Sequence, residues 1–200
     1  MSYIAVRGKG DPNIEAANTR HHAAALRRGL HCQDVEEGPA RNRSYFDFVV
    51  PPLEGFWWQD PADDQIDYAR KGDFNFISCI RLPDFVTRDD SIGPSRSCRQ
   101  KKLDFSAVEM LKVDEAYAFN ACHTGPYDGE PATIDAMHAC AAEQGYAPDF
   151  SEARLHHEIY LSDPRKCAPE KLKTVIRHPS SRFSGTKRRN VLQARLFNRQ

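Results

Sequence analysis

The sequence has few of the features that mark membrane-bound or disulfide-bonded proteins. Among its 200 residues there is no long hydrophobic run, no Cys-x-x-Cys pair and no Gly-x-Ser-x-Gly element. No early apolar segment resembles a signal peptide, so we expect a cytoplasmic protein that does not interact with a membrane. The six scattered cysteines favour free, mostly buried thiols, although an oxidised pair is left open.

Net charge is also absent, because 28 basic and 28 acidic residues cancel. Six of the basic residues lie within 180–200, a segment without any acid, which leaves 22 basic against 28 acidic residues in the body. An acidic body argues against nucleic acid as a partner of the folded part. We interpret 180–200 as a basic, solvated or partly helical tail. RNA, DNA or an anionic membrane stay open as its alternatives.

Metal ligands are not arranged at a recognised spacing. The pairs His21-His22 and His156-His157 are adjacent in sequence, and adjacent side chains point apart on a strand or helix. No third ligand follows at the spacing of a known zinc motif. We therefore predict no metal site. Gly8-Lys9-Gly10 lacks the remaining elements of a phosphate-binding loop, and we predict no cofactor.

The chain contains one pattern twice: a turn that opens a helix, a short apolar run with one acid, and a strand ending in proline. The repeated segments are the turns 10–12 and 129–131, the acid-bearing runs 52–58 and 156–161, and the strand ends 80–83 and 176–179. We predict an α+β fold of duplicated β-α-β-β units with pseudo-two-fold symmetry around a central ligand cleft.

Alternation, capping residues and turn signals give the expected elements. Strands are predicted at 3–7, 46–50, 53–58, 74–81, 105–112, 117–123, 156–161 and 172–177, and helices at 13–30 and 133–144. The domain is predicted to cover 1–179, with a first repeat at about 3–83, a linker at about 88–102 and a second repeat at about 105–179. The basic tail follows it.

Alternate side chains of a strand share a face, which predicts where the acids point. Glu158 and Tyr160 share one face, whereas Ile159 and Leu161 share the other and are expected to pack on a helix. Glu158 should then face away from that helix. By the repeat, Glu54 becomes the equivalent acid and is expected to face the same groove.

Aromatic residues near these acids suit a flat, apolar ligand, and a positively charged one would gain from the carboxylates. The candidate ligand-binding residues are Trp57, Trp58, Glu54, Phe56, Phe74, Phe76, Phe119 and Tyr160. For Glu54, a solvated strand residue or an ion-pair partner is the favoured alternative. At least one of the two adjacent tryptophans is expected to be ordinary core.

A carboxylate flanked by aromatic rings is partly desolvated, which predicts a pKa raised toward neutrality and a capacity to act as general base on water. Glu158 is the candidate base. Tyr127, in the turn before the second helix, could donate a hydrogen bond to a leaving oxygen. A structural salt bridge from Glu158 to Arg81 or Arg177 competes evenly with catalysis.

Several long motifs resemble the GyrI-like small-molecule-binding domain family. They are Ile4 to Asn13, Val49 to Trp58, Gly125 to Asp128, His156 to Arg165 and Ala168 to Thr174, in the family's order. The resemblance covers roughly residues 3–179 and implies the duplicated fold with its central cleft. Within the family, the chain resembles the cyclopropanoid cyclopropane hydrolases, which open the strained ring of yatakemycin- and CC-1065-like DNA-alkylating compounds.

That resemblance implies a detoxifying hydrolase in which Glu158 and Tyr127 are the catalytic pair and Trp57 helps to clamp the ligand. Phe74 and Phe76 stand where tryptophans are expected in relatives, which bears on substrate choice. The alternatives are a module that binds or sequesters lipophilic drugs without turnover, and a gyrase-inhibitor-like interaction protein. In each case we expect a monomer or weak dimer.

Overall fold

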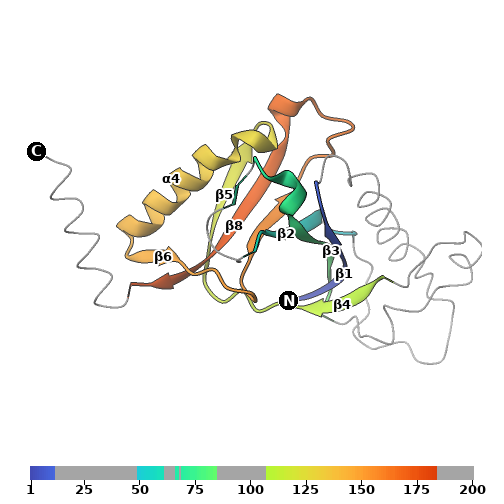
Figure 1. The fold of residues 1–200 in the computed structure, drawn as a ribbon, viewed down its shortest axis with the longest axis horizontal. Coiled ribbons are helices and arrows are strands. Elements are labelled where there is room, and N and C mark those ends of the chain that lie inside the picture. The colour runs from blue at the N-terminus through green and yellow to red at the C-terminus, as the bar shows by residue number, and fades with distance from the viewer. Residues whose placement is uncertain (12–48, 61–65, 68, 85–106, 184–200) are drawn as a thin grey trace, which may run out of the picture.

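The computed structural model describes residues 1–11, 49–60, 66–67, 69–84 and 107–183, and the following statements concern these residues (Figure 1). The predicted helix at 13–30 and the linker at 88–102 lie outside them. So does most of the predicted strand at 46–50, of which the two described residues are not in a strand.

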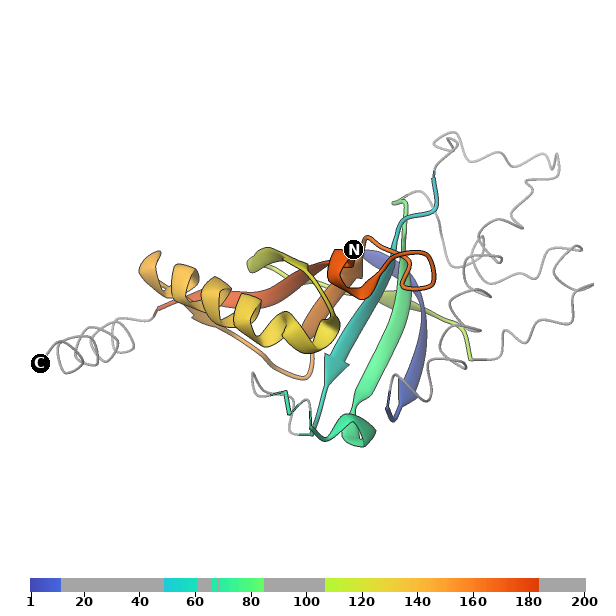
Figure 2. The ribbon, with the colours of Figure 1, turned by 90° about the horizontal axis from the view of Figure 1, so that it is seen from above.

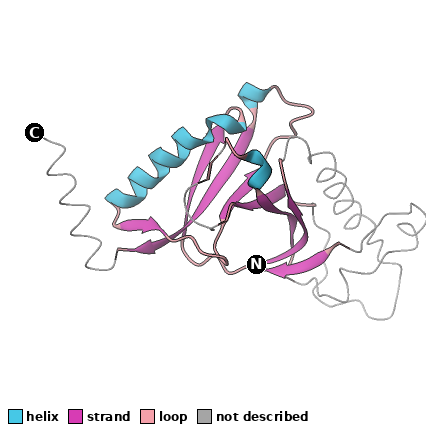
Figure 3. Ribbon diagram, viewed as in Figure 1, coloured by secondary structure: helices cyan, strands magenta, loops and turns pink. Residues whose placement is uncertain are grey.

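The described strands form an antiparallel eight-stranded sheet (Figure 3). Along the sheet the order is β4-β1-β3-β2-β7-β8-β5, with β6 paired to β8. The strands are β1 (Ser2–Lys9), β2 (Leu53–Trp58), β3 (Asn75–Leu82), β4 (Glu109–Lys112), β5 (Ala118–Thr124), β6 (Tyr146–Pro148), β7 (His156–Tyr160) and β8 (Lys173–Arg182).

The two halves of the chain meet at the central pair of strands, β2 and β7. Within the halves the strands follow corresponding orders, β1-β3-β2 and β5-β8-β7. In the β2–β7 register Gly55 lies opposite Glu158, and Trp57 lies opposite His156. The mid-sheet position of Glu158 therefore comes from pairing between residues about a hundred positions apart in the chain.

One α-helix, α4 (Glu130–Glu143), lies within the described residues and packs against β5 and β6 (Figures 1 and 2). The short 3₁₀ turn η2 (Tyr127–Gly129) leads into it, and Pro131 occupies its first turn, where a missing N–H is harmless. Gly145, with φ of 84°, follows its end in the left-handed region that glycine tolerates. Two further 3₁₀ turns are η1 (Lys71–Asp73) and η3 (Pro169–Lys171).

Most predicted elements agree with the structure to within a few residues at their ends. Two differences stand out. No sequence pattern predicts β6, a three-residue strand that pairs with β8. The last strand, β8, continues to Arg182, past the boundary predicted at residue 179, because Tyr146–Pro148 pair with its final residues.

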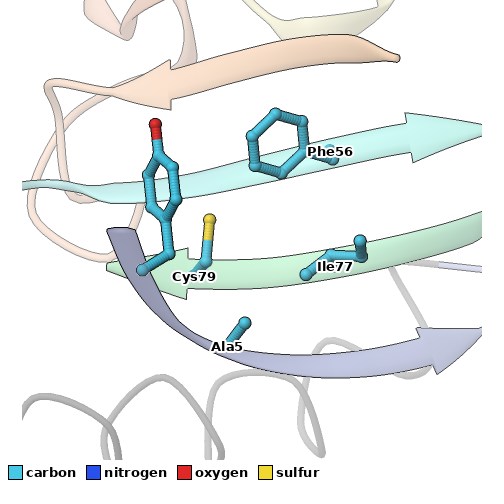
Figure 4. Packing of buried hydrophobic residues seen from close by; sticks show 5 residues of the cluster. Ala5, Phe56, Ile77 and Cys79 are labelled. Carbon is cyan, nitrogen blue, oxygen red and sulfur yellow. The ribbon is translucent and has the colours of Figure 1, made fainter. Parts of the chain in front are cut away.

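Apolar residues are buried on both faces of the β1–β3–β2 half. On one face Ile4, Val6, Ile80 and Leu82 pack together. On the other face the cluster is Tyr3, Ala5, Phe56, Ile77 and Cys79, and Figure 4 shows its labelled members from β1, β2 and β3 directed to a common side. Burial of these chains, at about 25 cal/mol per Å² of apolar surface, fixes which face each neighbouring residue takes.

A buried polar network lies on the same face as Phe56. The Nε2 atom of His157 is 2.8 Å from Glu54 Oε2, and its Nδ1 atom is hydrogen-bonded to Glu115. Arg177 donates to the second oxygen of Glu115 at 2.7 Å. The His157 ring also stacks on Phe56, with ring centroids 4.1 Å apart. Glu54 is thus an ion-pair partner that joins β2 to β7.

Replacing Glu54 with glutamine is expected to lower the free energy of unfolding by about 1–3 kcal/mol, since it weakens a buried, charge-assisted hydrogen bond. Urea unfolding followed by circular dichroism measures the change. Glu109→Gln is the matched control: Glu109 pairs with Arg7 at the surface, where side chains are 41% and 55% exposed, and should change stability by less than about 0.5 kcal/mol. Equal losses in the two variants would contradict this assignment.

Candidate functional site

Glu158 lies on the face of the sheet opposite to the Glu54 network. Residues paired across antiparallel strands share a face, so Glu158 shares one with Gly55 of β2 and Ile176 of β8. The same face carries Trp57 and His156. It is also the face that α4 covers, because His138 of α4 is hydrogen-bonded through His178 to His156.

The prediction that Glu158 points away from the helix is therefore wrong. The aliphatic pair that was expected to pack on the helix does not determine the face: Leu161 is 52% exposed. The face is determined instead by three hydrogen-bonded histidines, His138 of α4, His178 of β8 and His156 of β7. Neither Arg81 nor Arg177 is the partner of Glu158, since Arg177 binds Glu115 and Asn120.

Glu158 is 8% exposed. His156 Nε2 lies 2.8 Å from its Oε1 atom, and the Tyr160 hydroxyl and the Glu130 carboxyl group are its other polar neighbours. Burial by itself raises the pKa of Glu158, but the hydrogen bond and charge of His156, with the bonds from Tyr160 and Glu130, outweigh it and lower the pKa. The predicted rise toward neutrality is thus corrected, and Glu158 is ionised at neutral pH.

Glu130, the first residue of α4, is a site residue that the sequence reasoning missed. It is 1% exposed and sits beside Glu158. Burial, followed by the negative charge of Glu158, raises the pKa of Glu130 to about 10. The available signal was its position three residues after Tyr127, in the turn already identified as a possible border of the site.

Three histidines extend from Glu158 to the helix. His156 Nδ1 lies 2.6 Å from His178 Nε2, and His178 Nδ1 lies 2.8 Å from His138 Nε2. His178 stands between two imidazoles, and burial together with the charges of His156 and His138 lowers its pKa to about 2. A neutral His178 can donate through one ring nitrogen and accept through the other, so this chain orients His156 toward Glu158.

A cluster of aromatic rings adjoins Glu158 through Tyr160. Trp57 Nε1 donates to the Tyr160 hydroxyl at 2.8 Å, and the Trp57 ring lies 5.3 Å from Phe76 and 5.8 Å from Phe74, centroid to centroid. Tyr127 meets Tyr160 edge-on at 6.0 Å. Burial, then the negative charge of Glu158, raises the pKa of Tyr160, which therefore stays a neutral donor. The five rings offer an aromatic surface beside an ionised carboxylate.

Two glycines allow this arrangement by close approach. A Cβ atom at position 55 would lie 2.6 Å from Trp57 Nε1 and 2.7 Å from the Tyr160 hydroxyl. A Cβ atom at position 8 would lie 2.1 Å from the ring of Phe76. Real Cβ atoms do not approach other heavy atoms so closely, so both positions require glycine for the rings to lie flat on the sheet.

The structure gathers only part of the predicted set. Six of the predicted residues lie in one cluster: Glu158, Tyr160, Trp57, Phe74, Phe76 and Tyr127. Glu54, Phe56 and Trp58 do not, because they alternate with Trp57 along β2 and face the opposite side of the sheet. The prediction that Glu54 faces the same groove as Glu158 is wrong for this reason.

Phe119 also lies away from the ring cluster. It is on β5, opposite His178 in the register, and its ring packs edge-on against Tyr146 at 5.5 Å. That contact belongs to the region where α4 and β6 meet the sheet. Phe119 therefore supports the helix rather than the rings around Glu158.

Glu130, His156 and Glu158 also offer one possible metal-ligand atom each, within 4.8 Å of one another. His156 and Glu158 are already joined by a direct hydrogen bond of 2.8 Å. The absence of a metal site therefore stays a prediction, and the direct contact among these side chains is a hydrogen bond.

Comparisons with known proteins identify the family and the fold. The family model of the GyrI-like small-molecule-binding domain matches residues 1–179. An uncharacterized conserved protein from Listeria innocua has a similar structure, with 37% sequence identity, a TM-score of 0.78, and coverage of 90% of this chain and 88% of that one. A protein described as a hydrolase from Listeria innocua has 35% identity and a TM-score of 0.74, with coverage of 90% and 87%.

The matched family consists of small-molecule-binding domains. The chain belongs to the GyrI-like family of such domains. The EcmrR C-terminal domain, at 12% identity and a TM-score of 0.53 over 91% of this chain and 92% of that one, shares the fold. No curated protein matches the chain significantly. Among the described residues, no helix has the length and apolar character needed to cross a membrane.

Gly55→Ala is expected to lower the free energy of unfolding by about 1–3 kcal/mol, because the added methyl group pushes Trp57 and Tyr160 off the sheet. Chemical denaturation measures the loss, and tryptophan fluorescence should report the displaced indole. In the matched control Gly72→Ala, the new Cβ meets nothing within 4 Å, and stability should change by less than about 0.5 kcal/mol. A Gly55→Ala protein as stable as this control would contradict the close approach.

His178 should make the protein acid-sensitive. Its pKa is about 2 in the folded chain against 6.5 ordinarily, so below pH 6.5 the unfolded state takes up a proton that the folded state does not. Stability is then lost as the pH falls, by at most about 1.4 kcal/mol per pH unit for this one group. The decline below pH 6.5 should be shallower in His178→Asn than in the natural protein, measured by urea unfolding at several pH values. Parallel declines would refute the assignment.

Proposed function

We propose that the protein is a cofactor-independent hydrolase that opens the cyclopropane ring of lipophilic, aromatic spirocyclopropane compounds by adding water. The observation that carries the proposal is an ionised, buried carboxylate, Glu158, beside Tyr160, whose hydroxyl is in turn hydrogen-bonded to Trp57. Such compounds are flat and apolar, which suits an aromatic surface. The relatives described as hydrolases support a catalytic role.

The chemistry needs only positioning and charge. Glu158 removes a proton from a water molecule as its oxygen forms a bond to the unsubstituted ring carbon. The strained carbon–carbon bond breaks, and its electron pair passes into the dienone, whose oxygen becomes a phenolate. Tyr127 donates a hydrogen bond to that oxygen, and protonation then gives the phenol. The product is the substrate plus one water.

Burial and hydrogen bonding prepare Glu158 for this role. A carboxylate with a lowered pKa is a weak base in water, but it is fully ionised at neutral pH and has no need to lose a proton first. Release of ring strain and formation of an aromatic ring supply the driving force. Orientation of the water is therefore what the site contributes most.

The duplicated architecture belongs to the same proposal. We place the ligand near the β2–β7 junction, with Trp57 from one half and Tyr160 and Tyr127 from the other in contact with it. The corresponding strand orders of the two halves support a duplication, whose first helix, predicted at 13–30, lies outside the described residues.

A second candidate is a drug-binding module without turnover. The aromatic cluster with an adjoining carboxylate is what a sequestering site for lipophilic cations would contain, and the family name describes small-molecule binding. In that case Glu158 would act as counter-charge. The two functions differ in whether the product appears.

Incubation with a spirocyclopropane alkylator, followed by mass spectrometry, should show a product heavier by one water above the uncatalysed rate. Glu158→Gln should lower kcat by at least about a hundredfold, the usual size of a general-base contribution. Tyr127→Phe should lower it by about tenfold or more. Trp57→Ala should raise KM.

Glu109→Gln, at an exposed strand position on β4, is the control and should react like the natural protein. Stoichiometric binding without product in the natural protein would reject the hydrolase and favour the sequestering module. Full turnover in Glu158→Gln would reject Glu158 as the base.

A further inference from the structure

Glu130, unlike Glu158, has no hydrogen-bond donor beside its carboxyl oxygens within the described part of the chain. Among the described residues, no N–H or O–H group hydrogen-bonds to either of its carboxyl oxygens, although it is 1% exposed. Glu158, by contrast, is hydrogen-bonded to His156 and Tyr160. A buried carboxylate with no donor is one of the costliest arrangements in a protein, so its state requires an explanation.

The surroundings of Glu130 disfavour a negative charge. The titratable and charged groups around it are Glu158, Tyr160 and His156 of β7, and Asp128 of η2. Both acids act against ionisation, and Lys71 of η1 is bound to Asp128, at 2.8 Å. The amide dipoles at the start of α4 favour an acid there, but burial and the charge of Glu158 outweigh them.

We propose that Glu130 is a positioning residue: as a neutral carboxylic acid it donates a hydrogen bond to the Glu158 carboxylate and holds that group in place for the water. The pair then carries a single negative charge. His156 holds Oε1 of Glu158 from one side, and Glu130 and Tyr160 complete its hydrogen bonds. This inference rests on the proposed function only for its catalytic consequence, and not for the protonation state of Glu130.

A neutral donor at position 130 leads to a specific expectation for substitutions. Glutamine has nearly the same shape, has no charge, and can donate through its amide, so it reproduces the protonated acid. Alanine removes the donor and leaves Glu158 with one bond fewer. If the site used Glu130 as a carboxylate, glutamine at this position would reduce activity as much as alanine does.

The first test does not depend on turnover. Carbon-13 NMR of protein labelled at the glutamate side-chain carboxyl carbon reports protonation directly, and Glu130→Gln identifies the signal. At pH 7 the Glu130 signal should be that of a neutral acid, and it should titrate near pH 10. Glu158→Gln removes the neighbouring charge and should shift that titration to lower pH. A Glu130 carboxylate that is ionised at pH 7 in the natural protein overturns the proposal.

The second test uses the alkylator assay. Glu130→Gln should keep kcat within about threefold of the natural protein at pH 7, while Glu130→Ala should lose about tenfold or more, as expected when a hydrogen bond to a charged group is removed. As the pH rises through 10, the natural protein gains a second negative charge and should lose activity. Glu130→Gln has no proton to lose there and should stay active.

The two proposals fail separately. If the natural protein forms no product, the hydrolase is rejected, and the NMR titration still decides the state of Glu130. If Glu158→Gln is inactive but Glu130→Ala reacts like the natural protein, Glu158 remains the base and Glu130 is rejected as a positioning residue. Should the alanine variant fail to fold, Glu130→Gln decides: a loss as large as that of Glu158→Gln overturns the proposal.

Discussion

The arrangement of this protein depends on placing a negative charge inside the sheet. An ionised carboxylate in the interior is stable only when donors surround it, and Glu158 has His156 and Tyr160 beside it, with Glu130 as the proposed third donor. The first two donors are themselves held by neighbours: His156 by His178, and Tyr160 by the indole of Trp57. Removing one member therefore leaves another buried polar group unsatisfied, which makes the cluster a cooperative unit.

The pairing of β2 with β7 divides the polar residues into two separate sets. His157 and Glu158 are adjacent in the chain yet face opposite sides, so one belongs to a structural network with Glu54 and the other to the ring cluster. The structural network joins the two halves of the chain. The ring cluster adjoins Glu130, a buried acid whose carboxyl oxygens have no N–H or O–H donor among the described residues. Both sets contain a histidine held between two acids or two imidazoles, and both border aromatic rings: His157 stacks on Phe56, and Glu158 lies beside Tyr160.

The proposed chemistry suits a site whose charge stays constant as the pH changes. A site with Glu130 neutral and Glu158 ionised has one negative charge over a wide pH range, since the pKa of one acid is lowered and that of the other is raised to about 10. A hydrolase that only orients water needs such a constant charge more than it needs a strong base. Glycine at positions 8 and 55 lets the rings lie close to the sheet, so the carboxyl groups are covered.

The order of the elements, the alternation within β2 and β7, and the family motifs can all be read from the residues alone. These are local properties, since the side chains of one strand alternate whatever strand it pairs with. The face of each strand that carries the site could not be read in this way, because it depends on long-range strand pairing and on the hydrogen-bonded histidines that join α4 to the sheet. The tertiary structure separated Glu54 from Glu158 and brought in Glu130. The pKa of Glu158 follows the same rule: the raised value expected for it reflected burial alone, and polar neighbours on β7 and α4 reversed the direction.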